Sequence, residues 1–504
     1  MKQIFIATLV LVAFVTLSVQ AQETIRGQVK DKNSGNPLPG ATVMTNIPLT
    51  GVITDHNGYF EFSKTEGLTT LKVNYLGYKP TDYELNQGSA RGFILIELQP
   101  DILGLDEISI IATYARERES PVAVSTIKTA SIEREMGNQD YPEIMKMVPG
   151  VYATKLGGGN GDARISIRGF QQENIALLLN GIPVSSMENG LVYWSNWAGL
   201  GDATQTIQVQ RGLGASRVAL NSVGGTINII TKSTEAKKGG SIRYAVSDFG
   251  NHKTTLSLSS GKLKNDYAIT FLGSRTSGPG YVDATASNAW AWFLTVSKRI
   301  NSTHTLVFTG LGSPERHGQR NYGLTKEEYD NFGNKYNPNW GMFNGKINSL
   351  SENFYHKPQL SLNHYWNIND KALLASSAYI SFGTGGGKFA ESFMSQPVYN
   401  FRKNNQIDWD AVYLQNINNT DTATLSNGEK VTGFSKIIQS DYLASHVWFG
   451  GLSTLNYQAN KKLKIITGIH ARYFKSNLKE QISDLLGGKF WIDNYAWAIE
   501  GIGD

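Results

Sequence analysis

Residues 222–232 read SVGGTINIITK, in which two adjacent glycines precede a β-branched run. Gly224 and Gly225 permit a positive φ or a close backbone approach. The run from Thr226 to Thr231 strongly prefers a β-strand. We therefore expect a tight turn that feeds a short strand. Because this local pattern is common, the rest of the chain has to indicate what the strand belongs to.

The chain begins with one cation, Lys2, followed by an apolar run from Ile4 to about Leu17 and a small-residue sequence that ends at Ala21. This pattern predicts a secretory signal peptide at residues 1–21, because the run is short and polar sequence follows it. No other segment approaches the roughly 18–20 apolar residues that a membrane-spanning helix needs. We expect a mature protein that starts near Gln22 and lies outside the cytoplasm.

Composition narrows the class further. The 504 residues contain no cysteine, which excludes disulfides, thiolate metal sites and lipid attachment at a cysteine. A net charge of +5 is too diffuse to indicate a nucleic-acid partner. The 52 glycines, 23 tyrosines, 21 phenylalanines and 10 tryptophans indicate an exported β protein that is rich in glycine and aromatic residues.

Residues 22–100 contain short alternating runs separated by turn signals, including Asn57-Gly58, and predict a small antiparallel β-sandwich. The segments GQVKDKNSGNPLPGATV, TDHNGYFEF and YLGYKP resemble the carboxypeptidase regulatory-like domain over its whole length. That resemblance implies a domain without catalytic activity.

Residues 101–119 contain DEISIIA (106–112) and then a charged stretch. One interpretation is an interdomain linker. The other is an exposed segment that adds as a strand to the sheet edge of a partner. The residues alone leave both interpretations open.

Residues 120–234 mix helical and strand signals and predict a compact α+β domain, with a short helix that ends near Pro149-Gly150. RISIRGF, LLLNGIPV, IQVQRGLGASRV and SVGGTINIITK follow one another within it. This order resembles the plug domain of TonB-dependent outer-membrane receptors, and the preceding domain makes the layout similar to receptors of the Bacteroidetes type. One departure is ASRVALNSVGG, where many members carry Tyr-Gly after the Ala-Ser pair. SVGGTINIITK would then be the last plug strand.

Residues 235–504 show alternating runs joined by short turns such as RINSTH, NINDK and QANKK, in alternation with long connections. This pattern predicts a transmembrane antiparallel β-barrel, and a soluble array of β-sandwiches is the alternative. The fold class expected for the whole chain is mainly β, with a sandwich, an α+β plug and an incomplete barrel. We count about ten barrel strands, whereas the family has twenty-two, so we expect a fragment of a longer receptor.

The resemblance also implies partners and site residues. DEISIIA lies where the family keeps its TonB box, so TonB, with its inner-membrane energising complex, would pair with Asp106, Glu107, Ile108, Ser109, Ile110 and Ile111. Arg168 and Arg211 resemble plug arginines that pair with barrel glutamates, with ordinary surface arginines as the alternative.

Ligand contacts should come from loops that reach the extracellular side. The plug loops at 155–163 and 185–200 are candidates, and the second carries a dense aromatic and amide cluster that could equally pack against the barrel wall. Arg316, His317 and Arg320 could meet an anionic chelate, although a solvated loop is the favoured interpretation. The plug candidates are Glu188, Asn189, Tyr193, Trp194, Asn196 and Trp197.

The plug ending SVGGTINIITK resembles iron-chelate receptors more than glycan importers, which carry an Ala-Asn-Gly-Val version. We therefore expect import of a ferric siderophore or ferric citrate across the outer membrane, with oligosaccharide, haem and cobalamin as alternatives. A glycan importer would require a surface lipoprotein partner.

An enzyme is not expected, because the chain lacks H-E-x-x-H, G-x-S-x-G and a P-loop. We expect no cofactor, no resident metal and no catalytic residue. The barrel would contact outer-membrane lipid. A structural or adhesive surface protein is a further alternative, although it would not need a TonB box.

Overall fold

The computed structural model describes residues 24–99, except 33–34, 48–49, 64, 66, 76–77, 79 and 86–92, and residues 123–493, except 213–221, 233–237, 394–396 and 461. The expected signal peptide, residues 1–21, lies outside the described residues. The chain forms two compact units, and the first contains the strands up to residue 98.

The first unit is a small β-sandwich, as the sequence predicts. One sheet has the order β4-β1-β7 and the other has the order β3-β2-β5-β6. The strands are β1 (Thr24–Asp31), β2 (Thr42–Thr45), β3 (Gly51–Ile53), β4 (Tyr59–Ser63), β5 (Thr70–Asn74), β6 (Thr81–Glu84) and β7 (Phe93–Leu98). The antiparallel expectation is wrong for one pair, because β1 and β7 run parallel. Val29, Val43, Leu71 and Leu98 are fully buried between the sheets.

The first part of the second unit is an α+β layer with a five-stranded sheet in the order β12-β11-β14-β13-β8. One expected helix is instead two short ones separated at Gly137, which has a φ of 45°. The elements are β8 (Ala123–Lys128), α3 (Thr129–Glu135), η2 (Tyr141–Met147), β9 (Val151–Lys155), β10 (Ala163–Ile167), η3 (Gln172–Asn174), β11 (Ile175–Leu179), β12 (Ile182–Pro183), η4 (Trp194–Trp197), α4 (Leu200–Ala203), β13 (Thr204–Arg211) and β14 (Gly225–Thr231).

The glycine pair seats β14 at the centre of this layer. Gly225 has a φ of 145°, and a Cβ there would lie 2.3 Å from the carbonyl oxygen of Gln210 on β13. All seven residues of β14 are buried. Ile227 and Ile229 join the core of the layer, while Ile230 packs with Val307, Tyr365 and Ala375 of a second sheet. Every residue of the strand is buried because both faces are covered, although the face with Ile230 also holds Thr226 and Asn228.

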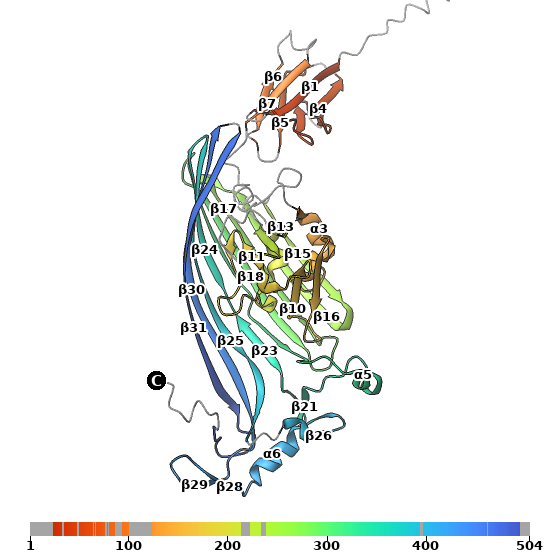
Figure 1. The fold of residues 1–504 in the computed structure, drawn as a ribbon. Coiled ribbons are helices and arrows are strands. Elements are labelled where there is room, and N and C mark those ends of the chain that lie inside the picture. Colours follow the sequence, from red (N-terminus) through yellow and green to blue (C-terminus); the bar gives the residue numbers. More distant parts are fainter. Residues whose placement is uncertain are drawn as a thin grey trace, which may run out of the picture. The chain divides into compact units, whose positions relative to one another are not determined.

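The second sheet has eleven strands and is called the wall below. Figure 1 shows its strands curving along one side of the α+β layer. Its long strands are β15 (Gly239–Ser247), β16 (Asn251–Lys262), β17 (Tyr267–Gly278), β18 (Ser287–Arg299), β19 (His304–Gly312), β24 (Gln359–Asn369), β25 (Ala372–Ser392), β30 (Ile437–Asn460) and β31 (Leu463–Asp484), and the short ones are β20 (Glu315–Gly318) and β23 (Glu352–His356). In the described part, β15 pairs only with β16 and β31 only with β30, so the barrel is incomplete.

Connections alternate in length along the wall from β16 onward, as predicted, whereas β15 and β16 are joined by only the short η5 (Asp248–Gly250). Short turns join β16 to β17, β18 to β19, β24 to β25 and β30 to β31. At the other end, two long connections carry α5 (Lys326–Phe332), β21 (Trp340–Phe343), β22 (Lys346–Ser349), η8 (Val398–Asn400), β26 (Arg402–Lys403), β27 (Gln406–Asp408), α6 (Trp409–Ile417), β28 (Thr422–Thr424) and β29 (Lys430–Thr432). We call this the loop end; Figure 1 shows α5 and α6 there. Among the described residues, no helix is both long and apolar enough to cross a membrane.

The sequence pattern also predicts a long connection from Thr384 to Asp441, and this prediction is wrong for the first part of that stretch. Residues 384–392 continue β25 and pair with β30. The glycine run at 385–387 suggested a loop, but a Cβ at Gly385 would lie 2.2 Å from the carbonyl oxygen of Phe354. These glycines therefore allow close strand approach.

Gly225→Ala should destabilise the protein by about 2 kcal/mol or more, because alanine at this φ is strained and its Cβ meets a backbone oxygen. The measurement is the midpoint of thermal unfolding of the purified protein. Gly239→Ala is the control, since a Cβ at Gly239 has no heavy atom within 4 Å. Equal midpoints for the two variants would contradict this role of Gly225.

Candidate functional site

The connection between β9 and β10 brings a glycine-rich loop against the wall at its loop end. Gly157 accepts a hydrogen bond from the Arg320 backbone at 2.8 Å. Gly158 has a φ of 78°, and a Cβ there would lie 2.6 Å from the Val282 side chain. Larger residues would hold this loop away from the wall. The glycines therefore let the loop come close to the wall, and the cavities described below lie beside this contact.

A cavity of about 720 Å³ lies between this loop and the wall, and we call it the tip cavity. Its lining residues are Lys155, Leu156, Gly157, Gly158, Gly159, Asn160, Arg164, Phe249, Asn251, Tyr281, Arg320, Asn321, Tyr322 and Gly323. Three of these side chains are cations, three are aromatic rings, and none of the lining residues in the described part is acidic. The cavity therefore favours a bulky anionic ligand with flat or apolar parts.

Two of the aromatic rings are fixed by contact with each other. Phe249 and Tyr281 meet edge to face, with their ring centroids 4.7 Å apart. Phe249 has a φ of 60°, which is uncommon for a bulky residue, and it is 49% exposed. The Lys335 ammonium lies 5.9 Å from each ring centroid. The two rings therefore form an aromatic surface that is already in place before a ligand binds.

A second cavity of about 230 Å³ shares several lining residues with the tip cavity, among them Arg164 and Arg320. Tyr193 and Trp194 also line it, so the structure brings these two expected ligand residues together with Arg320. The Arg320 guanidinium donates to the carbonyl oxygens of Asn334 and Tyr336 at 3.1 and 2.9 Å, which fixes its position.

The other residues of the 185–200 loop divide between surface and core. Tyr193 is 47% exposed, and its hydroxyl accepts from the Asn189 amide at 2.9 Å. Trp194, Trp197 and Asn196 are at most 5% exposed. The Trp194 indole donates to Gln172 at 2.8 Å and stacks on Tyr141. The burial of these three residues favours packing over direct ligand contact, while Trp194 also lines the second cavity, so the choice between the two interpretations stays a prediction.

Arg316 and His317 lie on β20 rather than in a solvated loop. His317 is only 2% exposed, and its two ring nitrogens lie 2.8 Å from the Asp162 carboxylate and 2.6 Å from the Glu315 carboxylate. A neutral imidazole carries a single N–H, so only an imidazolium can donate to both carboxylates at once. His317 therefore bridges the α+β layer and the wall. Arg316 instead pairs with Glu352 and is exposed.

The hydrogen bonds of this bridge keep the Asp162 carboxyl ionised. Burial alone would raise the pKa of the Asp162 carboxyl, but hydrogen bonds from His317 and Gln319 outweigh burial and hold the pKa below its usual value. Asp162 therefore stays ionised at neutral pH, and the bridge keeps its charge.

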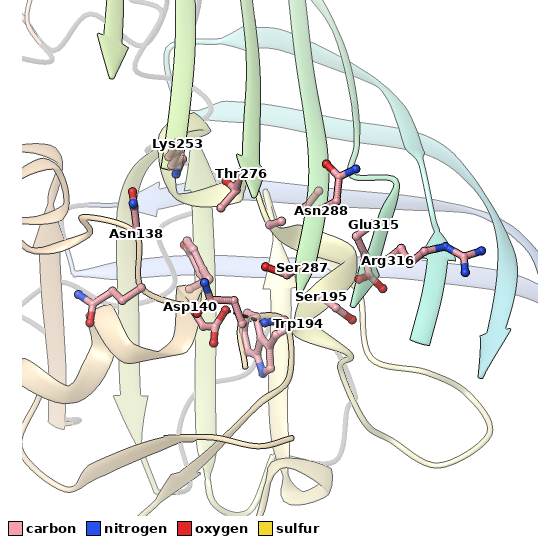
Figure 2. A pocket seen from close by; sticks show the side chains of 16 residues that line it. Asn138, Asp140, Trp194, Ser195, Lys253, Thr276, Ser287, Asn288, Glu315 and Arg316 are labelled. Atoms are coloured by element: carbon pink, nitrogen blue, oxygen red, sulfur yellow. Dashed lines mark hydrogen bonds between the residues drawn. The ribbon is translucent and has the colours of Figure 1, made fainter. Parts of the chain in front are cut away.

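A second ion pair holds the same interface. The Lys253 ammonium of β16 lies 2.6 Å from the Asp202 carboxylate of α4, and both side chains are at most 9% exposed. Figure 2 shows Lys253, Asp140 and Glu315 around a small interface cavity of about 50 Å³. Burial raises the pKa of Asp140 to about 6, against the attraction of Lys155 and a hydrogen bond from the Gly161 backbone.

The remaining expected residues do not join these cavities. Asp106–Ile111 lie outside the described residues. Arg168 is exposed, and the Arg211 guanidinium donates to the Pro149 carbonyl oxygen at 2.9 Å. In the described part of the chain, neither arginine forms an ion pair with a glutamate, so the latch stays a prediction. Glu188 does reach the wall, where it lies 3.2 Å from His446.

Sequence reasoning did not single out Arg164, Phe249, Tyr281 and Tyr322. Arg164 is the exposed first charge of RISIRGF, whose alternation does place it on the face opposite Ile165. The aromatic residues come from wall connections more than eighty residues away along the chain. No local signal joins such distant residues. In the described part, no group of three or more His, Asp or Glu side chains could hold a metal ion.

Two domain families match the chain. Residues 25–110 match the CarboxypepD_reg-like domain, and residues 116–226 match the TonB-dependent receptor plug domain. The chain therefore contains a plug domain of the kind found in TonB-dependent receptors. The α+β layer is accordingly called the plug from here on. The matched plug model describes transport receptors and not enzymes.

Two relatives are similar to the chain in sequence, and one solved structure is similar in fold. The ferric enterobactin receptor of Pseudomonas aeruginosa is 32% identical over 164 residues, which is 30% of this chain and 22% of the receptor. TonB-dependent receptor SusC of Bacteroides thetaiotaomicron is 25% identical over 440 residues, 82% of this chain and 40% of SusC. The pyoverdine outer membrane receptor FpvA of P. aeruginosa has a similar fold, with a TM-score of 0.50, 12% identity, and coverage of 72% of this chain and 48% of FpvA. The chain thus spans less than half the length of each of these proteins.

Asp140→Asn should stabilise the receptor at pH 7.5 and have little effect near pH 4. The raised pKa means that the folded protein loses stability as pH rises from about 4 to about 6, because an ionised Asp140 must be buried. At pH 7.5 the gain should be on the order of 3 kcal/mol, at about 1.4 kcal/mol for each pKa unit. The measurement is the thermal midpoint of both proteins at the two pH values. A gain of equal size at both would contradict this burial cost.

Proposed function

We propose that this chain forms the binding and gating part of an outer-membrane receptor that imports a bulky anionic nutrient, with a ferric chelate as the first candidate. The observation that carries the proposal is the tip cavity, where Lys155, Arg164 and Arg320 line the same space as three aromatic rings and no acidic lining residue is described. Ferric siderophores and ferric citrate present anionic oxygens on a compact body. Such groups match guanidinium donors.

The geometry also fits a gated importer. The plug lies against the wall through buried ion pairs, and the cavity opens beside the plug tip at the loop end. Outer-membrane barrels carry their long loops outside the cell and their short turns in the periplasm. The tip cavity would accordingly face the medium, and the plug would separate it from the periplasm.

TonB is the proposed source of energy. An outer membrane has no ATP, so accumulation against a gradient needs work delivered from the inner membrane. The segment Asp106–Ile111 would supply the contact by adding as a strand to a TonB sheet edge. Export by residues 1–21, the outer-membrane location and lipid contact belong to the same proposal.

Relatives support a ferric cargo and also supply a second candidate. Several matched relatives are named as enterobactin or siderophore receptors. A vitamin B12 transporter of Vibrio vulnificus is 22% identical over 397 residues, 75% of this chain and 56% of that protein. Because this match reaches beyond the plug, cobalamin is the second candidate. Haem and oligosaccharide are further alternatives, and an oligosaccharide importer would need a surface lipoprotein.

Arg164→Gln should weaken binding of the ferric chelate by about 10- to 100-fold, because a charge-assisted hydrogen bond contributes about 1.5–3 kcal/mol. The measurement is binding of iron-55 as ferric citrate and as ferric enterobactin to de-energised cells that carry the full-length gene. Arg134→Gln is the control, because Arg134 is a plug arginine with a side chain 71% exposed on α3. Unchanged affinity would place the ligand away from the tip cavity. Binding of cobalamin but of neither chelate would favour the second candidate.

Ile110→Pro should abolish energised uptake and leave surface binding unchanged. Proline removes one backbone donor from the strand that TonB would pair with. The measurement is uptake and binding of the same ligand in the same cells, with Ile110→Val as the control that keeps the donor. Normal uptake by Ile110→Pro would reject this segment as the TonB contact.

A further inference from the structure

A cluster of cations surrounds one tryptophan on the plug-facing side of the wall. Trp448 of β30 is 1% exposed and belongs to the core that the plug and the wall share. The Lys357 ammonium lies 4.5 Å from its ring centroid, and the Arg472 guanidinium lies 5.4 Å from it. We call Lys357, Trp448, Arg472 and the neighbouring His446 the wall cluster. Cation–π contacts orient its two cations but leave their charge unneutralised.

Two donors of the wall cluster have no acceptor among the residues that the structure describes. They are the buried Nε1 of Trp448 and the buried Nη1 of Arg472. Lys357 is 7% exposed, and within the described residues it forms no ion pair. An unpaired buried donor costs about 1–3 kcal/mol, and a buried charge without a counter-ion costs more. Such a set of donors is built to receive oxygen atoms that carry negative charge.

The plug supplies one carboxylate at the edge of this cluster. Glu188 lies 3.2 Å from Nε2 of His446, and Nδ1 of the same ring lies 2.7 Å from the Tyr355 hydroxyl. The preceding residue, Met187, contacts the Arg472 guanidinium through its sulfur. The Glu188 side chain is 29% exposed and belongs to a surface loop of the plug. Its charge can therefore leave the wall when that loop moves, whereas the cations stay.

We propose that the wall cluster is a second binding site for anions. Glu188 blocks this site while the plug lies against the wall. An anionic oxygen group of the cargo occupies the site once the plug loop that carries Glu188 has moved. This rests on the proposed function, because the cargo must pass between the plug and this side of the wall. The ligand class is a carboxylate or a comparable oxyanion, and the Trp448 ring offers an apolar surface beside it.

Replacement of the Glu188 carboxylate by a cargo carboxylate has a physical advantage. If the plug loop left without replacement, the wall would face the passage with two or more uncompensated positive charges in a poorly hydrated space. A cargo carboxylate that takes over as counter-ion keeps the local charge balanced. The cluster would thus draw an anionic cargo from the tip cavity along the wall.

The test is binding of radiolabelled citrate to the purified full-length receptor by equilibrium dialysis. Glu188→Ala removes the guarding carboxylate and should add about one citrate per receptor relative to the parent. Adding Lys357→Gln or Arg472→Gln to Glu188→Ala should remove that extra citrate. Adding Lys357→Arg, which keeps the charge, should retain it. Lys264→Gln in the turn between β16 and β17 is the matched control and should also retain it.

Two results would overturn the proposal. In one, Glu188→Ala binds no more citrate than the parent. In the other, the extra citrate persists after both Lys357→Gln and Arg472→Gln. Binding at the tip cavity, which all variants share, reports whether each is folded. Failure of this proposal would appear as a missing difference in citrate binding between the variants. Failure of the proposed function would appear instead as a parent receptor that binds no ferric chelate.

Discussion

The plug is held against the wall by buried charges that neither partner could bury alone. Lys253 and Asp202 form one such pair, and His317 between Asp162 and Glu315 forms another. Removing one member would leave an uncompensated buried charge, at a cost of about 3–5 kcal/mol. The tip cavity depends on this docking, because its cations come from the plug and the wall together.

The charged groups between the plug and the wall differ from one end of the interface to the other. Near the plug tip the charged groups form ion pairs between the plug and the wall. Farther along the wall, the cluster around Trp448 keeps two buried donors that have no acceptor among the described residues. In such an interface, ion pairs hold the plug against the wall while no cargo is bound, and the free donors remain available to bind an anionic cargo. The apolar core that the plug shares with Leu272, Phe293 and Leu311 adds cohesion that does not depend on charge.

Sequence alone could predict the elements whose signal is local. The glycine pair before β14, the sandwich turns and the short turns of the wall all follow from neighbouring residues. Pairing direction is not local, which is why the parallel β1–β7 pair was missed. Gly385–Gly387 have a loop-like composition, yet their lack of side chains serves strand contact.

The site was harder to predict for the same reason. Aromatic residues in the 185–200 loop suit a ligand surface and a core equally well, and only burial separates Trp194 and Trp197 from Tyr193. Phe249, Tyr281 and Arg164 meet only after the wall has folded around the plug. His317 looked like a loop residue until the structure placed it between two carboxylates.

Import of a ferric chelate is tested most directly by uptake of radioactive iron, as ferric citrate and as ferric siderophores, in iron-starved cells with and without the intact gene. We predict that deletion abolishes uptake of at least one chelate and that inactivating TonB has the same effect with no additive loss. Unchanged uptake of every chelate after deletion would contradict a ferric cargo.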